Sequence, residues 1–430
     1  MWCVSEYRLL KLYLSRSIGF MYDVQSREIF TSRQSRWKIS TFDYETIYDL
    51  SKDDKVGRTA KCTKSTIRSL WLRSCKARMK DRNVLIHVHG GGFISQSPET
   101  HAYYLADWVH NLKGKLFSNI LVKSLNEFFA WFLFLKDVTV ISVDYTLSPE
   151  GPFPEALQEV LDVYLWLTSD DPEVKRLLGF KPKKIAICGD SAGGNIAAAL
   201  VLVLSKIREK HFQNDSIPYP CSLLLFYSPL ILTTSLISPS RLMTSVDGLI
   251  PLAPLLNCMR AYIPDEVFPV DTQTVQVDES FLTKLRNWIF ASIYIYNIYY
   301  LKTITIICFK TFSHSFTDCR CQPWFKQKES IEGNMALMNK FLSNPFVSPL
   351  LTNNFEYTKD IRLYCFGTTY DPFLDDTVQL CKRWRGSKQI FIMPRLPHGF
   401  LNLVKVSEKS ASTLTKILEF IVDAFDPSCD

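Results

Sequence analysis

Several features that would point to a particular class of protein are missing from this sequence. The 430-residue chain has 12 cysteines, but their spacing forms no regular framework of the kind seen in disulfide-rich domains. Its N-terminal stretch MWCVSEYRLLKLYLSRSIGF has no long apolar run, because Glu6, Arg8, Lys11 and Arg16 interrupt it. We therefore expect no secretory signal peptide, and a cytoplasmic protein with reduced thiols.

Metal-binding and cofactor-binding motifs are also scarce. Cys319 and Cys321 lie close to His314, but no second ligand pair follows at the spacing of a zinc site. The sequence therefore predicts neither a metal ion nor an organic cofactor.

Positive charge is concentrated in one window instead of being spread along the chain. The formal net charge is +7, and residues 58–82 alone hold nine lysines and arginines against one acid, Asp81. We interpret this window as a solvated basic face, with contact to an anionic membrane or lipid surface as the alternative. We expect no nucleic-acid partner.

The composition otherwise predicts a large globular fold without internal repeats. Hydrophobic residues make up 47% of the chain, which is sufficient for a sizeable core. The length favours either one large domain with an elaborated cap or two domains.

Apolar runs and helical patterns alternate along the chain. The runs at 84–89, 138–145 and 183–190 predict buried parallel strands, and helical spacing of apolar residues predicts a helix between the last two runs. Further strands are predicted at 221–228, 361–367 and 389–393, and further helices at 373–385 and 408–425. This order predicts an α/β fold with a doubly wound, mostly parallel sheet.

Glycine is rare in the chain, with 16 residues, yet Gly189, Gly193 and Gly194 cluster around Ser191. The order Gly189-Asp190-Ser191-Ala192-Gly193 at a strand-to-helix junction is the nucleophile elbow, Gly-x-Ser-x-Gly. In that sharp turn, side chains at the two glycines would collide with the neighbouring strand and helix. Ser191 is thus the candidate nucleophile.

An acyl-transfer site also needs amide donors for the oxyanion. His89-Gly90-Gly91-Gly92 follows an earlier strand, so its bare backbone can approach a substrate. We expect the N–H groups of Gly91, Gly92 and Ala192 to form an oxyanion hole. The alternative is a flexible loop at the strand's end.

A serine nucleophile requires a base, which follows it in the chain order of this fold. His211, His314 and His398 satisfy that order, but His398 is the one that follows a predicted strand in a loop. We therefore expect His398 to be the base. A loop histidine next to Pro397 and Gly399 that merely caps a helix or faces water is the alternative.

The acid of the site has three candidates, Asp371, Asp375 and Asp376, after the strand at 361–367. Asp371 is closest to the strand's end, so we prefer it as the carboxylate that orients the imidazole. With Pro372 it also forms a good N-cap and N1 pair for the next helix. Asp375 is the second choice.

Together these stretches resemble the hormone-sensitive lipase branch of the α/β-hydrolases. The matching segments are HVHGGGFISQS, ISVDYTLSPEGPFPEAL, CGDSAGGN, SPSRLMTS, NPFVSPLL, DPFLDD and LPHGF. The resemblance covers about residues 40 to 425. It implies a helical cap, a triad of Ser191, Asp371 and His398, and a lipase that acts on diacylglycerol, triacylglycerol, cholesteryl or retinyl esters at lipid droplets.

The resulting division of the chain has a core in two parts. We predict an N-terminal segment that contributes to the cap (1–82), a hydrolase core (83–230 and 355–430), a cap insertion (231–354) and two atypical insertions (115–136 and 289–312). A transmembrane span at 289–312 is disfavoured because Asn297 and Lys302 lie in its middle. Our hypothesis is that both insertions are translated intron sequence, because both favour residues with AT-rich codons; membrane contact by the cap is the alternative.

The predicted function is that of a serine ester hydrolase acting on lipid esters. The first alternative is a broad carboxylesterase or deacetylase of the same fold. The second is a non-catalytic binding protein that keeps the hydrolase pocket. The sequence predicts no oligomeric state.

Overall fold

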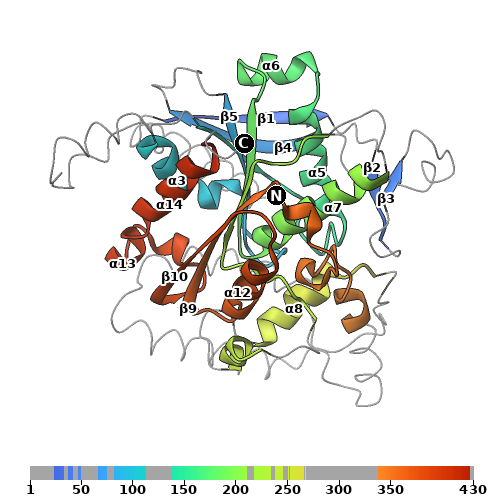
Figure 1. Cartoon of the computed structure of the whole chain (residues 1–430), viewed down its shortest axis with the longest axis vertical. Helices are drawn as coiled ribbons and strands as arrows, with labels where there is room; N and C mark the ends of the chain where they lie inside the picture. Colours follow the sequence, from blue (N-terminus) through green and yellow to red (C-terminus); the bar gives the residue numbers. More distant parts are fainter. Residues whose placement is uncertain are drawn as a thin grey trace, which may run out of the picture.

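The structure is a computed structural model, shown in Figure 1, and it describes most of the predicted core. The described residues are 24–32, 37–41, 47–49, 66–74, 82–112, 138–210, 217–233, 238–245, 250, 252–265, 267 and 338–426. Both atypical insertions, 115–136 and 289–312, lie outside these residues. So do His211, His314 and the Cys319–Cys321 pair.

One mixed sheet of eight strands organises the described residues, in the order β1-β4-β6-β5-β7-β8-β9-β10. Neighbours from β6 to β10 pair in parallel, whereas β4 pairs antiparallel with both β1 and β6. The predicted α/β fold with a mostly parallel sheet is thus confirmed. The strands are β1 (Val24–Ser32), β4 (Thr66–Ser74), β5 (Asn83–Val88), β6 (Val138–Val143), β7 (Lys184–Asp190), β8 (Ser222–Phe226), β9 (Arg362–Tyr370) and β10 (Lys388–Pro397), and a separate pair is formed by β2 (Trp37–Ile39) and β3 (Ile47–Asp49).

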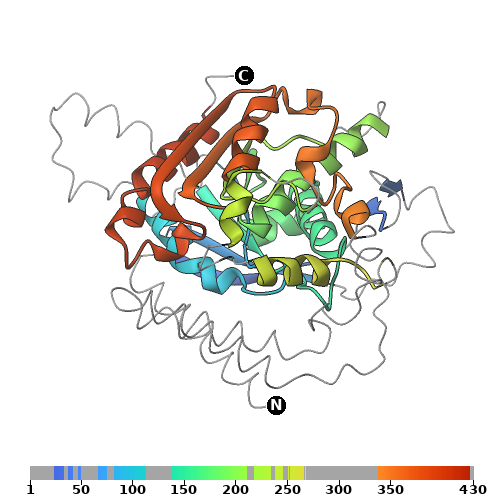
Figure 2. The same cartoon turned by 90° about the horizontal axis from the view of Figure 1, so that it is seen from below.

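Helices cover both faces of this sheet (Figures 1 and 2). Helices α3 (Pro98–Asn111) and α14 (Leu414–Ala424) pack on one face. Helices α5 (Glu155–Thr168), α7 (Ala192–Lys210) and α12 (Leu374–Arg383) pack on the other. The remaining helices are α6 (Pro172–Leu178), α8 (Leu252–Tyr262) and α13 (Glu408–Ala411), with 3-10 turns η2 (Ser240–Ser245), η4 (Pro349–Leu351), η5 (Glu356–Thr358) and η6 (Phe400–Leu403).

Each central strand supplies side chains to two separate cores. In β7, Ile185 and Ile187 join the core beneath α5 and α7, whereas Ala186 and Cys188 join the core beneath α3 and α14. This follows from the two-residue period of a strand, since successive side chains point to opposite faces. A strand covered on both faces therefore has no polar face, which is why β7 is apolar without interruption from Ile185 to Gly189.

The basic window contains a strand that the sequence analysis did not predict. Arg68 on β4 donates to Glu99 on α3 at 2.5 Å and to Asp144 at 2.6 Å. Arg73 on the same strand is buried. For these two arginines the predicted solvated basic face is wrong, because the sheet turns their side chains toward acids and apolar surface.

The predicted helix at 408–425 is divided in two. Helix α13 begins after Ser407, whose hydroxyl accepts a hydrogen bond from the Ser410 amide, and α14 starts at Leu414. Among the helices that the structure describes, none is both long and apolar enough to cross a bilayer.

Candidate active site

Ser191 lies at the tip of the turn between β7 and α7. Its backbone has a φ of 51°, in the left-handed region that a residue with a β-carbon rarely adopts. The turn is held from two sides, because the Ser191 amide donates to the Phe226 carbonyl at 3.0 Å and the Ser191 carbonyl accepts from Gly194 at 3.0 Å. A strained backbone held in place by its surroundings is typical of a functional position.

The glycines around Ser191 are required by close backbone contacts. A β-carbon on Gly189 would lie 2.5 Å from the Gly193 carbonyl, and one on Gly193 would lie 2.1 Å from the Val88 carbonyl oxygen. A β-carbon on Gly194 would meet the Ser228 hydroxyl. The turn can form only because these three side chains are absent, which is the reason the sequence analysis gave for the cluster.

Three side chains from distant parts of the chain meet at this turn. The Oγ of Ser191 lies 2.8 Å from Nε2 of His398, and Nδ1 of His398 lies 3.0 Å from Oδ1 of Asp371. His398 follows β10 and is packed edge-on against Tyr227 and Phe373. The structure thus brings together the serine, the histidine and the carboxylate that the sequence analysis had selected separately.

Asp371 also organises the backbone after β9. Its Oδ1 accepts from the Phe373 amide at 3.0 Å, and α12 then begins at Leu374 with Phe373 as N-cap. The predicted N-cap role for Asp371 is therefore wrong in position, since its side chain caps a turn just before the helix. Because the acceptor is the same Oδ1 that contacts His398, this turn fixes the carboxylate against the imidazole.

The other two candidate acids hold a different segment. Asp375 accepts from the Ser240 amide at 2.8 Å. Asp376 accepts from the amides of Leu230 and Ile231 at 2.8 and 2.9 Å and pairs with Arg241 at 2.7 Å. Both carboxylates therefore anchor the chain that follows β8, and neither has a hydrogen bond to His398 among the described contacts.

The loop after β5 has the conformation that its glycines allow. Gly91 and Gly92 have φ angles of 116° and 63°, both in the left-handed region. The Gly90 amide donates to Oδ1 of Asp190 at 3.0 Å, so this N–H is already engaged by the residue before the nucleophile. A β-carbon on Gly92 would lie 2.8 Å from Sγ of Cys258, which shows that α8 covers this loop closely.

His89 supports the loop from below. Its Nδ1 donates to the Gly90 carbonyl at 2.8 Å, its ring stacks on Tyr145 at 4.2 Å, and its own carbonyl accepts from the Tyr145 hydroxyl. Burial, with the facing His101 ring as a second cause, lowers the pKa of His89 to about 3. His89 is therefore a neutral structural donor, and it is not positioned as the base.

Sequence reasoning missed a polar cluster buried beneath the turn. His87 on β5, His101 and Tyr104 on α3, and Tyr227 after β8 all surround the carboxylate of Asp190. One signal was available, since His87 and His89 are two residues apart in the run predicted as a strand, 84–89, and side chains at that spacing point to one face. His101 gave no such signal, because a single histidine in a helix has no pattern to distinguish it.

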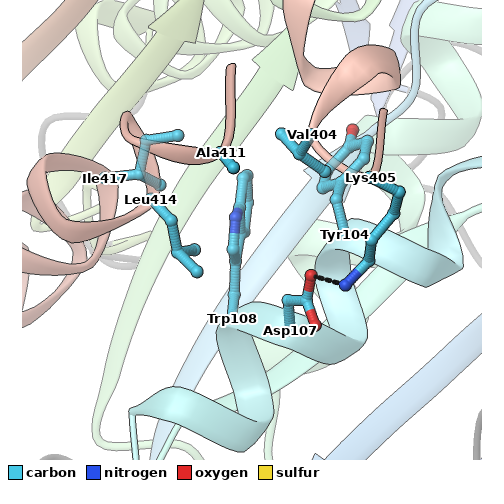
Figure 3. A pocket seen from close by; sticks show the side chains of 8 residues that line it. All are labelled: Tyr104, Asp107, Trp108, Val404, Lys405, Ala411, Leu414 and Ile417. Carbon is cyan, nitrogen blue, oxygen red and sulfur yellow. Dashed lines mark hydrogen bonds and ion pairs between the residues drawn. The ribbon is translucent and has the colours of Figure 1, made fainter. Parts of the chain in front are cut away.

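A cavity of about 210 Å³ lies between α3 and the C-terminal segment, as Figure 3 shows. The ion pair of Asp107 with Lys405 closes one side of it. Ser191, Asp371 and His398 do not line this cavity, so it is separate from the site. Its walls are formed by Tyr104, Asp107, Trp108, Val404, Lys405, Ala411, Leu414 and Ile417.

Metal ligands do not gather anywhere in the part of the chain that the structure describes. The pair Cys319 and Cys321, with His314, lies outside that part. The groups that meet at the turn are a hydroxyl, an imidazole and a carboxylate in hydrogen-bonded sequence.

The sheet order and the position of the serine turn are those of the α/β-hydrolase fold, and comparison with known proteins agrees. A family profile described as alpha/beta hydrolase fold matches residues 134–290. Hormone-sensitive lipase from Bos taurus is 30% identical over 219 residues, which cover 50% of this chain and 24% of that protein. The Homo sapiens protein of the same name is 30% identical over 220 residues, covering 50% of this chain and 17% of that protein.

This chain therefore has the α/β-hydrolase fold, and over half of its length it is similar to hormone-sensitive lipase. It spans less than a quarter of the length of the two hormone-sensitive lipases above. An esterase of Acinetobacter venetianus is 30% identical over 196 residues, covering 46% of this chain and 51% of that protein.

Solved structures show the same fold. A carboxylesterase cloned from a metagenomic library, EstE1, superposes with a TM-score of 0.56 at 15% identity, covering 98% of both chains. The esterase LipW from Mycobacterium marinum gives a TM-score of 0.55 at 16% identity, covering 98% of this chain and 89% of that one.

Proposed function

We propose that this chain is a serine ester hydrolase that works through an acyl-enzyme on Ser191. The observation that carries the proposal is the unbroken hydrogen-bonded series from Ser191 Oγ through both nitrogens of His398 to Asp371 Oδ1, at 2.8 and 3.0 Å. A nucleophile, a base and an orienting acid within hydrogen-bond reach of one another are the parts that acyl transfer requires.

In the proposed mechanism, His398 Nε2 takes the proton of Ser191 as Oγ attacks the ester carbonyl. The carboxylate of Asp371 keeps the proton of the imidazole on Nδ1, so that Nε2 presents a lone pair to the serine. The imidazolium then gives its proton to the leaving alcohol. Water, activated by the same histidine, releases the acyl group and regenerates Ser191.

The oxyanion that forms during each attack needs donors, and we assign them to the N–H groups of Gly91, Gly92 and Ala192. Ala192 is the first residue of α7, where amides have no partner within the helix and the dipole favours negative charge. Gly90 is excluded from this role, because its amide donates to Asp190.

We further propose lipid esters as the substrates, including diacylglycerol, triacylglycerol, cholesteryl and retinyl esters. Apolar side chains pack directly beside the glycine loop, since buried Phe93 stacks on Tyr262 of α8 with 4.0 Å between ring centroids. Helix α8 falls within the predicted cap, 231–354, which supports a cap over the site. On this proposal the protein works in the cytoplasm and at lipid droplets or membrane surfaces.

The first experiment is labelling of the purified protein with a fluorophosphonate probe, which reacts only with an activated serine. We expect wild type to label, and Ser191→Ala and His398→Ala to lose labelling. Ser205→Ala is the matched control, because this serine is buried on the same helix, α7, and contacts Glu209 instead. A folded wild-type protein that fails to label would leave the non-catalytic binding protein as the better account.

Substrate class is tested separately with an acyl-chain series of p-nitrophenyl esters and with emulsified diacylglycerol. We expect kcat/KM to rise with chain length beyond acetate and to be substantial for the emulsified lipid. A maximum at acetyl esters, with no hydrolysis of the lipid, would favour the carboxylesterase or deacetylase of the same fold.

A further inference from the structure

Asp190, the residue before the nucleophile, has a carboxylate that the proposed mechanism does not use. It is 2% exposed and lies within a group of polar side chains from three directions. Its Oδ1 accepts from the Gly90 amide at 3.0 Å and from the Tyr104 hydroxyl at 3.3 Å. Its Oδ2 accepts from the Tyr227 hydroxyl at 3.4 Å. A buried carboxylate of this kind is stable only when its charge is balanced.

Hydrogen-bond directions around Asp190 follow from the fact that a carboxylate only accepts. Tyr104 therefore donates its hydroxyl proton to Asp190, so the same hydroxyl must accept from Nε2 of His87 at 3.0 Å. With its proton on Nε2, His87 accepts from the Ser142 hydroxyl at Nδ1, at 2.8 Å. His87 is thus neutral, in agreement with burial, which lowers its pKa. It contributes no charge to balance Asp190.

His101 is different, because both of its ring nitrogens face acceptors. Its Nδ1 lies 3.0 Å from the Ser97 carbonyl, and its Nε2 lies 3.5 Å from Oδ1 of Asp190. The Thr100 hydroxyl lies 2.8 Å from the Ser97 carbonyl and 3.0 Å from Nδ1 of His101, and its single proton can serve only one of these two groups. Nε2 is fully buried and has no hydrogen-bond partner among the described residues. A ring protonated at both nitrogens offers one proton to the Ser97 carbonyl and one to Asp190.

We propose that Asp190 and a doubly protonated His101 form a buried ion pair that positions the Gly90 amide, and with it the glycine loop, relative to Ser191. This inference rests on the proposed ester hydrolysis, whose oxyanion donors belong to that loop. Asp190 is covalently joined to the nucleophile and hydrogen-bonded to the loop, so its carboxylate sets the spacing between the two. It acts as a positioning residue, since Gly90 and Ser191 stand between it and the substrate.

The Asp190 carboxylate is also connected to His398, the proposed base, through one side chain, that of Tyr227. Tyr227 donates to Oδ2 of Asp190 and packs edge-on against His398, with 4.7 Å between ring centroids. Every polar group facing the pair is otherwise neutral or a donor: His89 has a lowered pKa, and burial raises the pKa of Tyr104 and Tyr145. His101 is therefore the available counter-charge, and the facing imidazoles lower the pKa of Asp190 against the opposing effect of burial.

The test compares Asp190→Asn and His101→Gln with wild type in fluorophosphonate labelling and in hydrolysis of p-nitrophenyl butyrate. We expect the labelling rate constant and kcat to fall at least about tenfold in both variants, while KM stays within about twofold, because misplaced donors weaken the transition state more than the ground state. Asp162→Asn is the matched control, since Asp162 is a buried carboxylate on α5 that contacts Gln158 and should leave both rates unchanged.

A direct readout of the charge comes from nitrogen-15 spectra of the histidine-labelled wild-type chain. We expect His101, assigned by the signal that His101→Gln loses, to show two protonated ring nitrogens at about pH 8, where a free imidazole is neutral. This measurement does not depend on a variant that folds poorly.

The outcomes separate this inference from the proposed function. If wild type labels but Asp190→Asn labels equally fast, or if His101 shows a neutral ring, the positioning pair is wrong and the hydrolase proposal stands. If folded wild type does not label at all, the hydrolase proposal itself fails.

Discussion

The α-carbon of Gly193 on α7 faces the carbonyl oxygen of Val88 at the end of β5, so closely that an added methyl group would lie 2.1 Å from that oxygen. We therefore expect Gly193→Ala to push the nucleophile turn away from β5 and to lower the labelling rate of Ser191 on the order of 100-fold. The free energy of unfolding should fall by about 1–3 kcal/mol, the usual cost of overpacking. Labelling and urea denaturation measure the two effects, and wild-type labelling in Gly193→Ala would contradict the contact.

Asp371 and Asp375 provide a paired test of the acid. Replacing Asp371 by Asn removes the carboxylate that fixes the tautomer of His398, so kcat should fall by roughly 10⁴-fold with little change in KM. Asp375→Asn leaves His398 untouched and loses only an acceptor for Ser240, so kcat should stay within about threefold of wild type. If Asp375→Asn lowered kcat more than Asp371→Asn in an ester-hydrolysis assay, Asp375 would be the acid that orients His398.

Acid stability depends on His89. Its folded-state pKa of about 3 lies below the ordinary value of 6.5, so the unfolded chain binds more protons between these two pH values. The free energy of unfolding must therefore fall as the pH drops from 6.5 toward 3. His89→Asn keeps a donor for Gly90 but cannot titrate, so its stability should decline less steeply.

Urea denaturation at several pH values between about 4 and 7 measures this slope. The wild-type chain in the same titration gives the reference slope. An unchanged slope in His89→Asn would show that His89 does not resist protonation in the folded state.

Arg68 tests whether the basic window is part of the core. Its guanidinium contacts Glu99 and Asp144, and Glu99 is 9% exposed. Because Arg68→Met leaves these acids without their cation, the free energy of unfolding should fall by about 3 kcal/mol. The pair of Arg176 with Glu173 is exposed, so Arg176→Met should change nothing measurable in the same urea titration. If Arg68→Met and Arg176→Met changed the free energy of unfolding equally, Arg68 would belong to the solvated basic face.

The parts of the fold that could be predicted from the sequence are those encoded locally. Buried parallel strands are mostly apolar, so β5, β6 and β7 could be predicted as nearly continuous apolar runs. Ser191 could be predicted because glycines cluster around it at a strand-to-helix junction. Strand β4 could not be predicted, since its arginines resemble a solvated segment. Their partners Glu99 and Asp144 lie 31 and 76 residues away.

The residues of the candidate site likewise divide into those that the local sequence identifies and those that only the fold brings together. His398 could be selected by chain order and its position after a strand. Asp371 was preferred for its closeness to the strand's end, but the roles of Asp375 and Asp376 could not be predicted, because their partners Ser240 and Arg241 lie 135 residues earlier in the chain. The role of His101 was hidden for the same reason, because only folding brings α3 against the carboxylate of Asp190.

The two ends of the Ser191–His398 hydrogen bond belong to regions of unequal local stability. Helix α7 is buried without interruption from Ala192 to Ser205, so opening it would require unfolding of the whole core. The segment around His398 alternates buried Phe400 with exposed Lys405 and Val406, and it has fewer contacts to lose. Amide hydrogen exchange should therefore be fast near His398 and slow along α7. Mild heating should then abolish labelling of Ser191 while α7 is still folded, and cooling should restore the labelling.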